Sequence, residues 1–265
     1  MIDMHSHVLP GLDDGAPDME TSLEMARVAV ADGVEQIVAT PHVNSEFGAE
    51  PAIFAQRTGA LNGALAREEI PFAVLPGAEI AISRLPEMDD DALRGLTLGG
   101  GPALLVECPF TRPVAFLEDL LFDLQLRGFQ VVLAHPERCP LFHADQDRLA
   151  NLVDRGVMCS VTAASLHGGF GRRVQQVTAA LFQKGLVHNV ASDAHDPVNR
   201  APVLRAAFEK AEALMPGISA QRAWFTEAAP AAILAGDPLP PRPDPPAPPA
   251  APERPSLLGR LRRPR

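Results

Sequence analysis

The sequence is most informative first in what it lacks. It contains no tyrosine, one tryptophan and only three cysteines in 265 residues. The cysteines, Cys108, Cys139 and Cys159, are odd in number and show no Cys-x-x-Cys spacing, so no disulfide framework is expected. Free thiols of this kind fit a reducing compartment.

Long apolar runs and a basic excess are also absent. No stretch of about 18 apolar residues occurs, so no transmembrane helix is expected. The N-terminus has neither the basic nor the apolar region of a signal peptide. Together with the free thiols, these absences predict a cytoplasmic location. The formal net charge of −10 argues against a nucleic-acid-binding surface.

What the sequence does contain is a regular alternation of apolar and helical segments. Strands are expected over 1–7, 36–39, 72–75 with 77–80, 103–106, 130–134, 157–161 and 187–191. Helices are expected over 18–32, 51–69, 113–127, 145–155, 170–184, 198–214 and 221–234, with a short helix and a turn over 88–98. Apolar strands joined by helical crossovers predict an α/β fold with a parallel sheet. Polar side chains follow six or seven strand ends, whereas an open doubly wound sheet would place them at one crevice. We therefore expect a closed, distorted seven-stranded (β/α) barrel that resembles a TIM barrel.

The composition divides the chain into two parts. Residues 1–235 carry the alternating pattern and form the expected folded domain. Residues 236–265 hold eleven of the 27 prolines and end in an arginine-rich segment, so we expect an extended, disordered tail. The tail carries a charge of +3, which leaves −13 on the domain and would allow only weak contact with an anionic membrane.

Histidines and carboxylates recur at the expected strand ends. Nine such residues stand out: His5, His7, Asp14, His42, Glu79, Glu107, His135, Asp193 and His195. Residues i and i+2 of a strand point to one face, so His5 and His7 can bind one ion. Imidazole and carboxylate ligands suit Mn²⁺, Fe²⁺ or Zn²⁺. Nine groups exceed the needs of one ion, so two or three cations are expected to offset the carboxylate repulsion.

Several alternatives remain open at this point. Asp13 competes with Asp14 as a ligand, and spacing does not choose between them. His143, His167 and His188 lack a strand-end setting and are interpreted as ordinary surface or supporting residues. No Cys-x5-Arg phosphate loop, Gly-x-Ser-x-Gly elbow or Walker loop occurs.

Two arginines follow the expected ligands, Arg138 in His-Pro-Glu-Arg and Arg200 after His195. A guanidinium beside metal ions suits a phosphate oxygen, so both are candidate catalytic residues. The alternative is a surface salt bridge with Glu137 or Asp196.

Six motifs carry a family resemblance. They are Asp-Met-His-Ser-His at 3–7, Asp-Asp-Gly at 13–15, Ala-Thr-Pro-His at 39–42, Gly-Ala-Glu-Ile at 77–80, Ala-His-Pro-Glu-Arg at 134–138 and Ala-Ser-Asp-Ala-His at 191–195. In this order they resemble the polymerase-and-histidinol-phosphatase superfamily. Within it, the chain is similar to the bacterial manganese-dependent tyrosine-protein phosphatases of capsule and exopolysaccharide biosynthesis, over residues 1–235.

The resemblance implies a trinuclear manganese site. By that resemblance, the first ion would be held by His5, His7, Glu79 and Asp193, the second by Glu79, Glu107 and His135, and the third by Asp14, His42 and His195. Arg138 and Arg200 match the family's phosphate-contacting arginines. This chain departs from the family at Cys139, where tyrosine is common, and in the loop 43–47, which lacks a glycine-tyrosine pattern.

The expected function is therefore a metal-dependent phosphomonoesterase for protein phosphotyrosine, in which a hydroxide bridging two ions attacks phosphorus. The resemblance implies that its partner is a bacterial tyrosine kinase of polysaccharide export; no nucleic-acid partner is expected. One rival is a small-metabolite phosphatase, such as one for histidinol phosphate. Another is a non-catalytic regulatory binding protein, which would be expected to lack ligands that this chain retains.

Overall fold

The computed structural model describes residues 1–48, 51–110 and 116–246. Within this part the strands are β1 (Ile2–Ser6), β2 (Gln36–Ala39), β3 (His42–Val43), β4 (Ala73–Leu75), β5 (Glu79–Ala81), β6 (Ala103–Glu107), β7 (Gln130–Ala134), β8 (Met158–Thr162) and β9 (Asn189–Ala191). Every pairing between them is parallel. The expected parallel α/β architecture is confirmed.

The strands form one closed barrel, although two of them are interrupted. Only residues 40–41 separate β2 from β3, and only 76–78 separate β4 from β5. Because β2 pairs with β4 and β3 with β5, each pair of segments is one broken strand, and the described strands reduce to seven. The amide of Asp193 donates to the His5 carbonyl (2.9 Å) and the amide of His7 to the Ala194 carbonyl (2.8 Å), which joins the last strand to the first.

The breaks have local causes. Pro41 has no amide proton for the ladder, although its carbonyl accepts from the Glu79 amide at 3.1 Å. Gly77 lies where a β-carbon would come within 2.8 Å of the Val38 side chain. The close approach of the two broken strands therefore requires glycine at this position.

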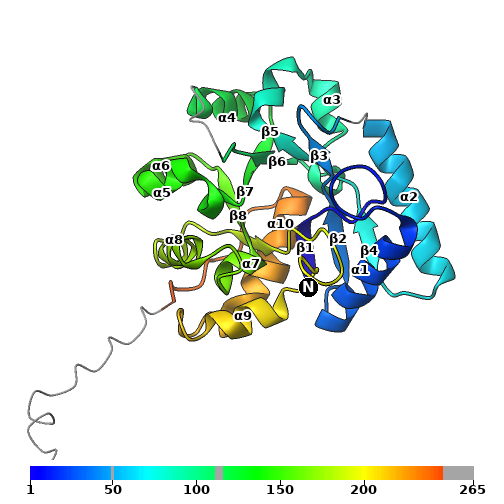
Figure 1. The fold of residues 1–265 in the computed structure, drawn as a ribbon. Coiled ribbons are helices and arrows are strands. Elements are labelled where there is room, and N and C mark those ends of the chain that lie inside the picture. The colour runs from blue at the N-terminus through cyan, green and yellow to red at the C-terminus, as the bar shows by residue number, and fades with distance from the viewer. Residues whose placement is uncertain (49–50, 111–115, 247–265) are drawn as a thin grey trace, which may run out of the picture.

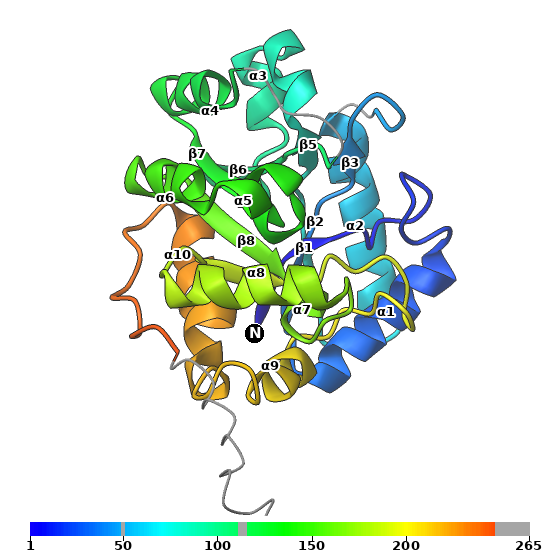
Figure 2. The same ribbon diagram turned by 60° about the vertical axis from the view of Figure 1, so that its left-hand side comes forward.

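Helices surround the strands (Figures 1 and 2). They are α1 (Met19–Asp32), α2 (Pro51–Arg67), α3 (Asp90–Arg94), α4 (Leu117–Leu126), α5 (Pro140–Ala144), α6 (Gln146–Asp154), α7 (Ala163–Leu166), α8 (Arg172–Gln183), α9 (Arg205–Ala211) and α10 (Ala229–Ala235), with a π-helical turn, Trp224–Ala228, before α10 and short 3₁₀ turns elsewhere. At the start of α1, Asp18 accepts from the Thr21 amide (2.9 Å), and at its end Gly33 adopts φ 91°. These two interactions cap the helix at both ends. None of the described helices has the length and apolar character needed to cross a bilayer.

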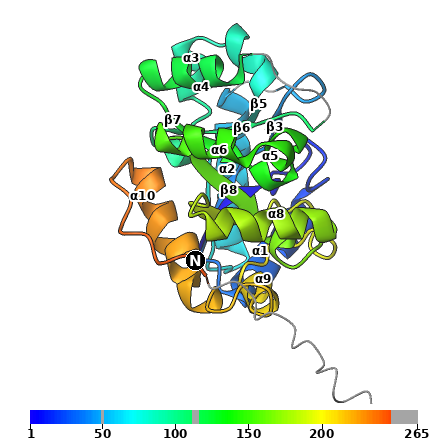
Figure 3. The same ribbon diagram turned by 90° about the vertical axis from the view of Figure 1, so that its left-hand side faces the viewer.

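Strand residues alternate between two apolar clusters. Leu104 and Val106 of β6 join the large cluster between strands and helices, whereas Ala103 and Leu105 join a second cluster that includes Ile233 of α10. Helix α10 lies on the opposite side of the strands from the loops that follow β1 and β3 (Figure 3). It therefore closes one end of the barrel and leaves the other end, here called the barrel mouth, for polar side chains.

One predicted helix differs from the structure. The short helix and turn expected over 88–98 correspond to α3 and the turns around it, but the helix expected over 198–214 is confined to α9. Asp196 explains this difference, because its carboxylate accepts hydrogen bonds from the amides of Val198, Asn199 and Arg200. This side chain holds a loop in place of a helical turn. The start of the helix expected at 113 lies outside the described residues.

The segment after α10 lies against the barrel. Gly236 ends the helix at φ 77°, and residues 237–246 continue without helix or strand. The Arg242 guanidinium donates to the Val187 carbonyl at 2.6 Å and lies 5.2 Å from the Trp224 ring, while Leu239 packs on the second cluster. The first ten residues beyond Gly236 thus contact the domain. The sequence predicts an extended, disordered tail over 236–265, and these contacts differ from that expectation for 237–246. Residues 247–265 lie outside the described residues, so for them the tail stays a prediction.

Truncation distinguishes the two parts of this C-terminal region. A chain ending at Pro246 should keep its melting temperature, whereas a chain ending at Gly236 should lose the Arg242 contact. A hydrogen bond to a charged group contributes about 1.5–3 kcal/mol, so the second truncation should lower Tm by about 3–8 °C. Calorimetry of both chains, with Arg242→Ala as a point-variant control, measures this. Equal Tm values for the two truncations would show that the 237–246 contacts contribute nothing.

Candidate metal centre

All nine predicted ligand residues lie at the barrel mouth. The strands and the loops after them supply His5, His7 and Asp14 from β1 and its loop, His42 from β3, Glu79 from β5, Glu107 from β6, His135 after β7, and Asp193 and His195 after β9. Their nitrogen and oxygen atoms form four overlapping groups, each with every ligand atom within 4.8 Å of the others. One network therefore joins side chains that are up to 190 positions apart in the sequence.

Four of these residues, His5, His7, Glu79 and Asp193, lie next to one another across two of the groups. His5 Nε2 lies 3.3 Å from both His7 Nε2 and Glu79 Oε2, and 3.5 Å from Asp193 Oδ1. His7 Nε2 lies 3.5 Å from the same two carboxylate oxygens. Four ligands at 2.0–2.2 Å from one tetrahedral ion are separated by about 3.3–3.6 Å. The donor atoms are therefore already spaced for a single cation.

Glu79 is the central carboxylate and is 1% exposed. Its Oε1 lies 2.8 Å from His135 Nε2, and its Oε2 lies 2.9 Å from His42 Nδ1. Neither Oε2 nor His42 Nδ1 has a hydrogen-bond partner of good geometry, although both are buried. Buried polar atoms without partners are costly, and a shared cation would satisfy these two. The residues present thus fit a metal on the structure's own evidence.

The pKa values of the two glutamates in the centre, Glu79 and Glu107, are shifted in opposite directions. Burial would raise the pKa of Glu79, but His5, His135 and His42 hold that pKa well below its ordinary value. Burial and the Glu79 charge raise the pKa of Glu107, whose Oε1 lies 3.7 Å from His135 Nε2. A cation between the two carboxylates would relieve this repulsion.

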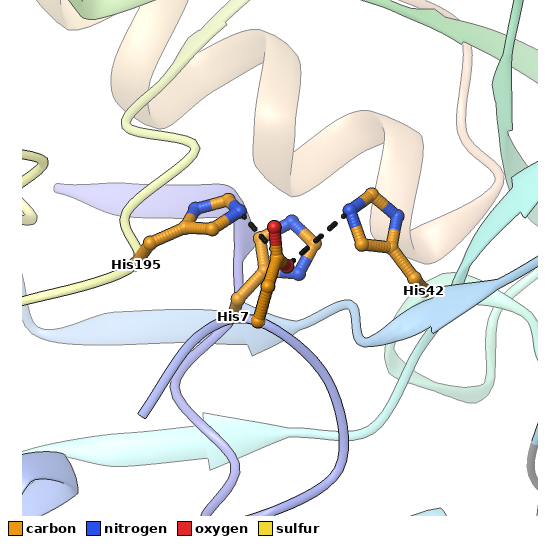
Figure 4. A group of neighbouring side chains, drawn as sticks. His7, His42 and His195 are labelled. Atoms are coloured by element: carbon orange, nitrogen blue, oxygen red, sulfur yellow. Dashed lines mark ion pairs between the residues drawn. The ribbon is translucent and has the colours of Figure 1, made fainter. Parts of the chain in front are cut away.

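Another of the four groups joins His7, Asp14, His42 and His195. Asp14 Oδ1 lies 3.6 Å from His42 Nε2 and 3.4 Å from His195 Nε2. The three imidazoles come from different parts of the chain and converge on one carboxylate (Figure 4). The Asp14 side chain is half exposed, so this group lies at the solvent side of the centre.

The structure separates the roles of Asp13 and Asp14. Asp13 Oδ2 lies 2.7 Å from His7 Nδ1 and accepts the His42 amide at 3.0 Å, while its Oδ1 accepts the Gly15 amide. A carboxylate on Nδ1 fixes the imidazole so that Nε2 faces the centre. Asp13 is therefore placed to position His7, whereas Asp14 is the aspartate whose Oδ1 faces the imidazoles of His42 and His195. A β-carbon at Gly15 would lie 2.1 Å from the His7 carbonyl, so this turn also requires glycine.

Both predicted arginines point into the centre. Arg138 Nη1 and Arg200 Nη2 donate to the same atom, Asp193 Oδ2, at 2.9 and 2.7 Å. The alternative of surface salt bridges with Glu137 and Asp196 is wrong. The Glu137 carboxylate is buried and accepts from the Thr162 amide, and Asp196 binds backbone amides.

Sequence reasoning missed two aromatic side chains and one carboxylate. The Arg138 guanidinium lies between Phe110 and Phe170, 4.8 and 4.1 Å from the ring centroids. Asp3, fully buried, accepts the Ser192 amide and so links β1 to the strand that carries Asp193. The signal for Asp3 was a carboxylate inside an apolar strand, which needs a buried partner.

The three remaining histidines join none of these groups within the described residues. His188 Nδ1 accepts the Cys159 amide at 3.0 Å, and burial, with Arg242 nearby, lowers the pKa of His188 to about 3. His143 contacts the Glu137 carbonyl. Their interpretation as supporting or surface residues agrees with these contacts.

The two aspartates should respond differently to amidation. Asp14→Asn should remove one bound metal equivalent, because it eliminates a ligand charge. Asp13→Asn should retain the stoichiometry and weaken affinity by about 10–100-fold, the usual effect of losing a residue that orients a ligand. Elemental analysis and calorimetric titration with Mn²⁺ measure both quantities. Asp18→Asn at the α1 N-cap is the control, since asparagine caps equally well. Identical behaviour of the Asp13 and Asp14 variants would contradict this division of roles.

Comparisons with known proteins agree with this geometry. The chain is 41% identical over 201 residues to the tyrosine-protein phosphatase YwqE of Bacillus subtilis (strain 168), covering 76% of this chain and 79% of the relative. It is 26% identical over 219 residues to the tyrosine-protein phosphatase CpsB of Streptococcus pneumoniae, covering 79% of this chain and 88% of the relative.

A solved structure gives the same result at the level of the fold. A chain from the crystal structures of YwqE from Bacillus subtilis and CpsB from Streptococcus pneumoniae, described as metal-dependent tyrosine phosphatases, superposes with a TM-score of 0.83 at 37% identity. The match covers 93% of this chain and 99% of that one. The family model for capsular polysaccharide synthesis proteins CpsB/CapC matches residues 1–231, and the chain therefore belongs to the CpsB/CapC family.

Proposed function

We propose that this protein is a metal-dependent phosphatase that hydrolyses phosphotyrosine in proteins. The observation that carries the proposal is the convergence of two guanidinium groups, Arg138 and Arg200, on a carboxylate oxygen of the nine-residue centre. Arginine pairs beside metal ligands suit a phosphoryl group. The relatives YwqE and CpsB, which share the family and the fold, are tyrosine-protein phosphatases.

The donor set supports two or three divalent cations, and manganese is the proposed metal. His5, His7, Glu79 and Asp193 would hold the first ion, Glu79, Glu107 and His135 the second, and Asp14, His42 and His195 the third. Bound cations would make a hydroxide available at neutral pH and offset charge on the phosphoryl oxygens. Fe²⁺ and Zn²⁺ accept the same ligands.

The chain's own residues would bind and orient the phosphoryl group. Each guanidinium has five N–H donors, and one nitrogen of each donates to Asp193 Oδ2. The other N–H groups can donate to phosphoryl oxygens. Phe110 and Phe170 hold the Arg138 guanidinium in a fixed plane. Preorganised donors of this kind stabilise charge that develops in the transition state.

The leaving group explains the preference for tyrosine. A phenol has a free pKa of about 10, so its phenolate leaves more readily than an alkoxide and needs less help from a general acid. No residue of the centre is required to act as that acid. The proposed substrate is the phosphorylated tail of a tyrosine kinase of polysaccharide export, consistent with a family of capsular polysaccharide synthesis.

The arginines should contribute to turnover without holding the metal. Arg138→Ala and Arg200→Ala should each lower kcat and kcat/KM by about 10²–10³, as loss of one donor to a transition-state oxyanion does. Metal content by elemental analysis should stay normal. Arg27→Ala, which removes an exposed pair with Glu68, is the matched control. Wild-type kinetics in both Arg138 and Arg200 variants would remove the arginines from the mechanism.

Substrate preference tests the proposed function directly. A phosphotyrosine peptide should give a higher kcat/KM than histidinol phosphate, and a phosphoserine peptide should be slower because its alkoxide leaves poorly. All three are assayed at equal metal loading, and EDTA should abolish every activity. A clear preference for histidinol phosphate would assign the centre to a metabolite phosphatase instead. Full activity in chelated, metal-free protein would eliminate the metal-dependent mechanism.

A further inference from the structure

A cavity lies beside the metal centre, between α7, the loop before α8, and α9. Its volume is about 260 Å³, and its walls include His167, Phe170, Arg200, Val203 and Lys210. Helices α7 and α9 lie side by side in Figures 1 and 2. None of the proposed metal ligands lines this cavity.

The cavity adjoins the proposed phosphoryl site through two shared side chains. Arg200 lines it and also donates to Asp193 at 2.7 Å. Phe170 lines it and packs on the Arg138 guanidinium at 4.1 Å. The two sites therefore share walls, and residues close together in one extended substrate segment could occupy both.

The charge of the cavity is positive in a chain whose net charge is −10. Arg200 and Lys210 are cationic, and no aspartate or glutamate lines the walls. Lys210 forms no ion pair with any described residue. The nearby Asp196 carboxylate is engaged by the amides of Val198 and Asn199. A hollow lined by one sign of charge concentrates ions of the opposite sign.

The shape of the lining favours a carboxylate on an aliphatic stem. Phe170 and Val203 provide apolar walls that can cover methylene groups, while Lys210 lies exposed at the edge. A singly charged carboxylate needs only one or two cationic donors. An aspartate or glutamate side chain meets these requirements.

We infer that this cavity is a specificity subsite that binds an acidic side chain, aspartate or glutamate, located near the phosphotyrosine in the same polypeptide. The inference rests on the proposed function and adds a sequence preference to it. Arg200 would contact both groups, and Lys210 is the residue that reads the acidic side chain. Ion pairs at exposed positions contribute modestly, so the preference should be about two- to fivefold.

Paired peptides test the subsite. A phosphotyrosine peptide with glutamate placed in turn at each position from three before to three after the phosphotyrosine is compared with its glutamine counterpart. At one or two positions the glutamate peptide should have a kcat/KM about two- to fivefold higher, mainly through a lower KM, and the advantage should shrink as ionic strength rises. A ratio of one at every position would overturn the inference.

The readout for the variants is the glutamate-to-glutamine ratio, which cancels any general change in activity. Lys210→Gln should bring the ratio close to one, and Lys210→Glu should invert it, so that the glutamine peptide has the higher kcat/KM. Lys184→Gln is the matched control, because Lys184 directly follows α8, pairs with Asp147 and does not line the cavity. It should leave the ratio unchanged.

The outcomes separate the two proposals. If the glutamate-to-glutamine ratio fell equally in the Lys184 and Lys210 variants, the preference would come from the overall charge of the protein, and the subsite would be overturned. Absence of turnover with every phosphotyrosine peptide, glutamine versions included, would instead refute the proposed function. Normal turnover of the glutamine peptides with no glutamate preference would refute the subsite alone.

Discussion

The structure depends on the burial of one carboxylate, that of Glu79, among imidazoles and other carboxylates. An isolated buried carboxylate is strongly disfavoured in a low-dielectric interior. Here His5, His42 and His135 surround it closely enough to hold its pKa well below the ordinary value. The cost of taking these groups out of water is large, so their persistence at one barrel end is best explained by cations that bind there.

The requirement to place these groups together explains how the barrel closes. The first and last strands meet where the Asp193 amide donates a hydrogen bond to the His5 carbonyl. The Asp3 carboxylate also links the two strands, because it accepts a hydrogen bond from the Ser192 amide. A slip of this junction would displace ligands from both ends of the chain at once. At the far end of the barrel, α10 contributes Ile233 to the apolar interior. One end is therefore apolar and closed, and the other is polar and accessible.

The mouth also places binding surfaces around the centre without further ligands. Phe110 stacks on His135 with centroids 5.3 Å apart, and Phe47 stacks on His42 at 6.0 Å. Aromatic side chains thus flank the ligands on several sides. Cys139, which the family resemblance places where tyrosine is common, is buried, and its thiol donates to the Pro109 carbonyl. The chain's substrate contacts are therefore expected to come from neighbouring aromatic and basic residues.

The sequence by itself determined the fold class and which side chains gather at the barrel mouth. Alternating apolar strands and helical segments predicted a closed parallel barrel, because such strands must be covered on both faces. Histidines and carboxylates repeated at strand ends predicted the ligand residues, because parallel strands all end on one side of the barrel. Both deductions rely on periodicity, which a single sequence displays directly.

Only the tertiary structure decided which neighbours each side chain meets. Asp13 and Asp14 are adjacent in sequence, and the turn geometry alone directs one to His7 Nδ1 and the other to His42 and His195. Arg138 could have paired with Glu137, but that carboxylate turns inward to the Thr162 amide. The helix expected from 198 gave way to a loop because Asp196 binds three amides. The physical reason is common to all three: hydrogen-bond partners are fixed by distance and direction in space, which spacing along the chain does not specify.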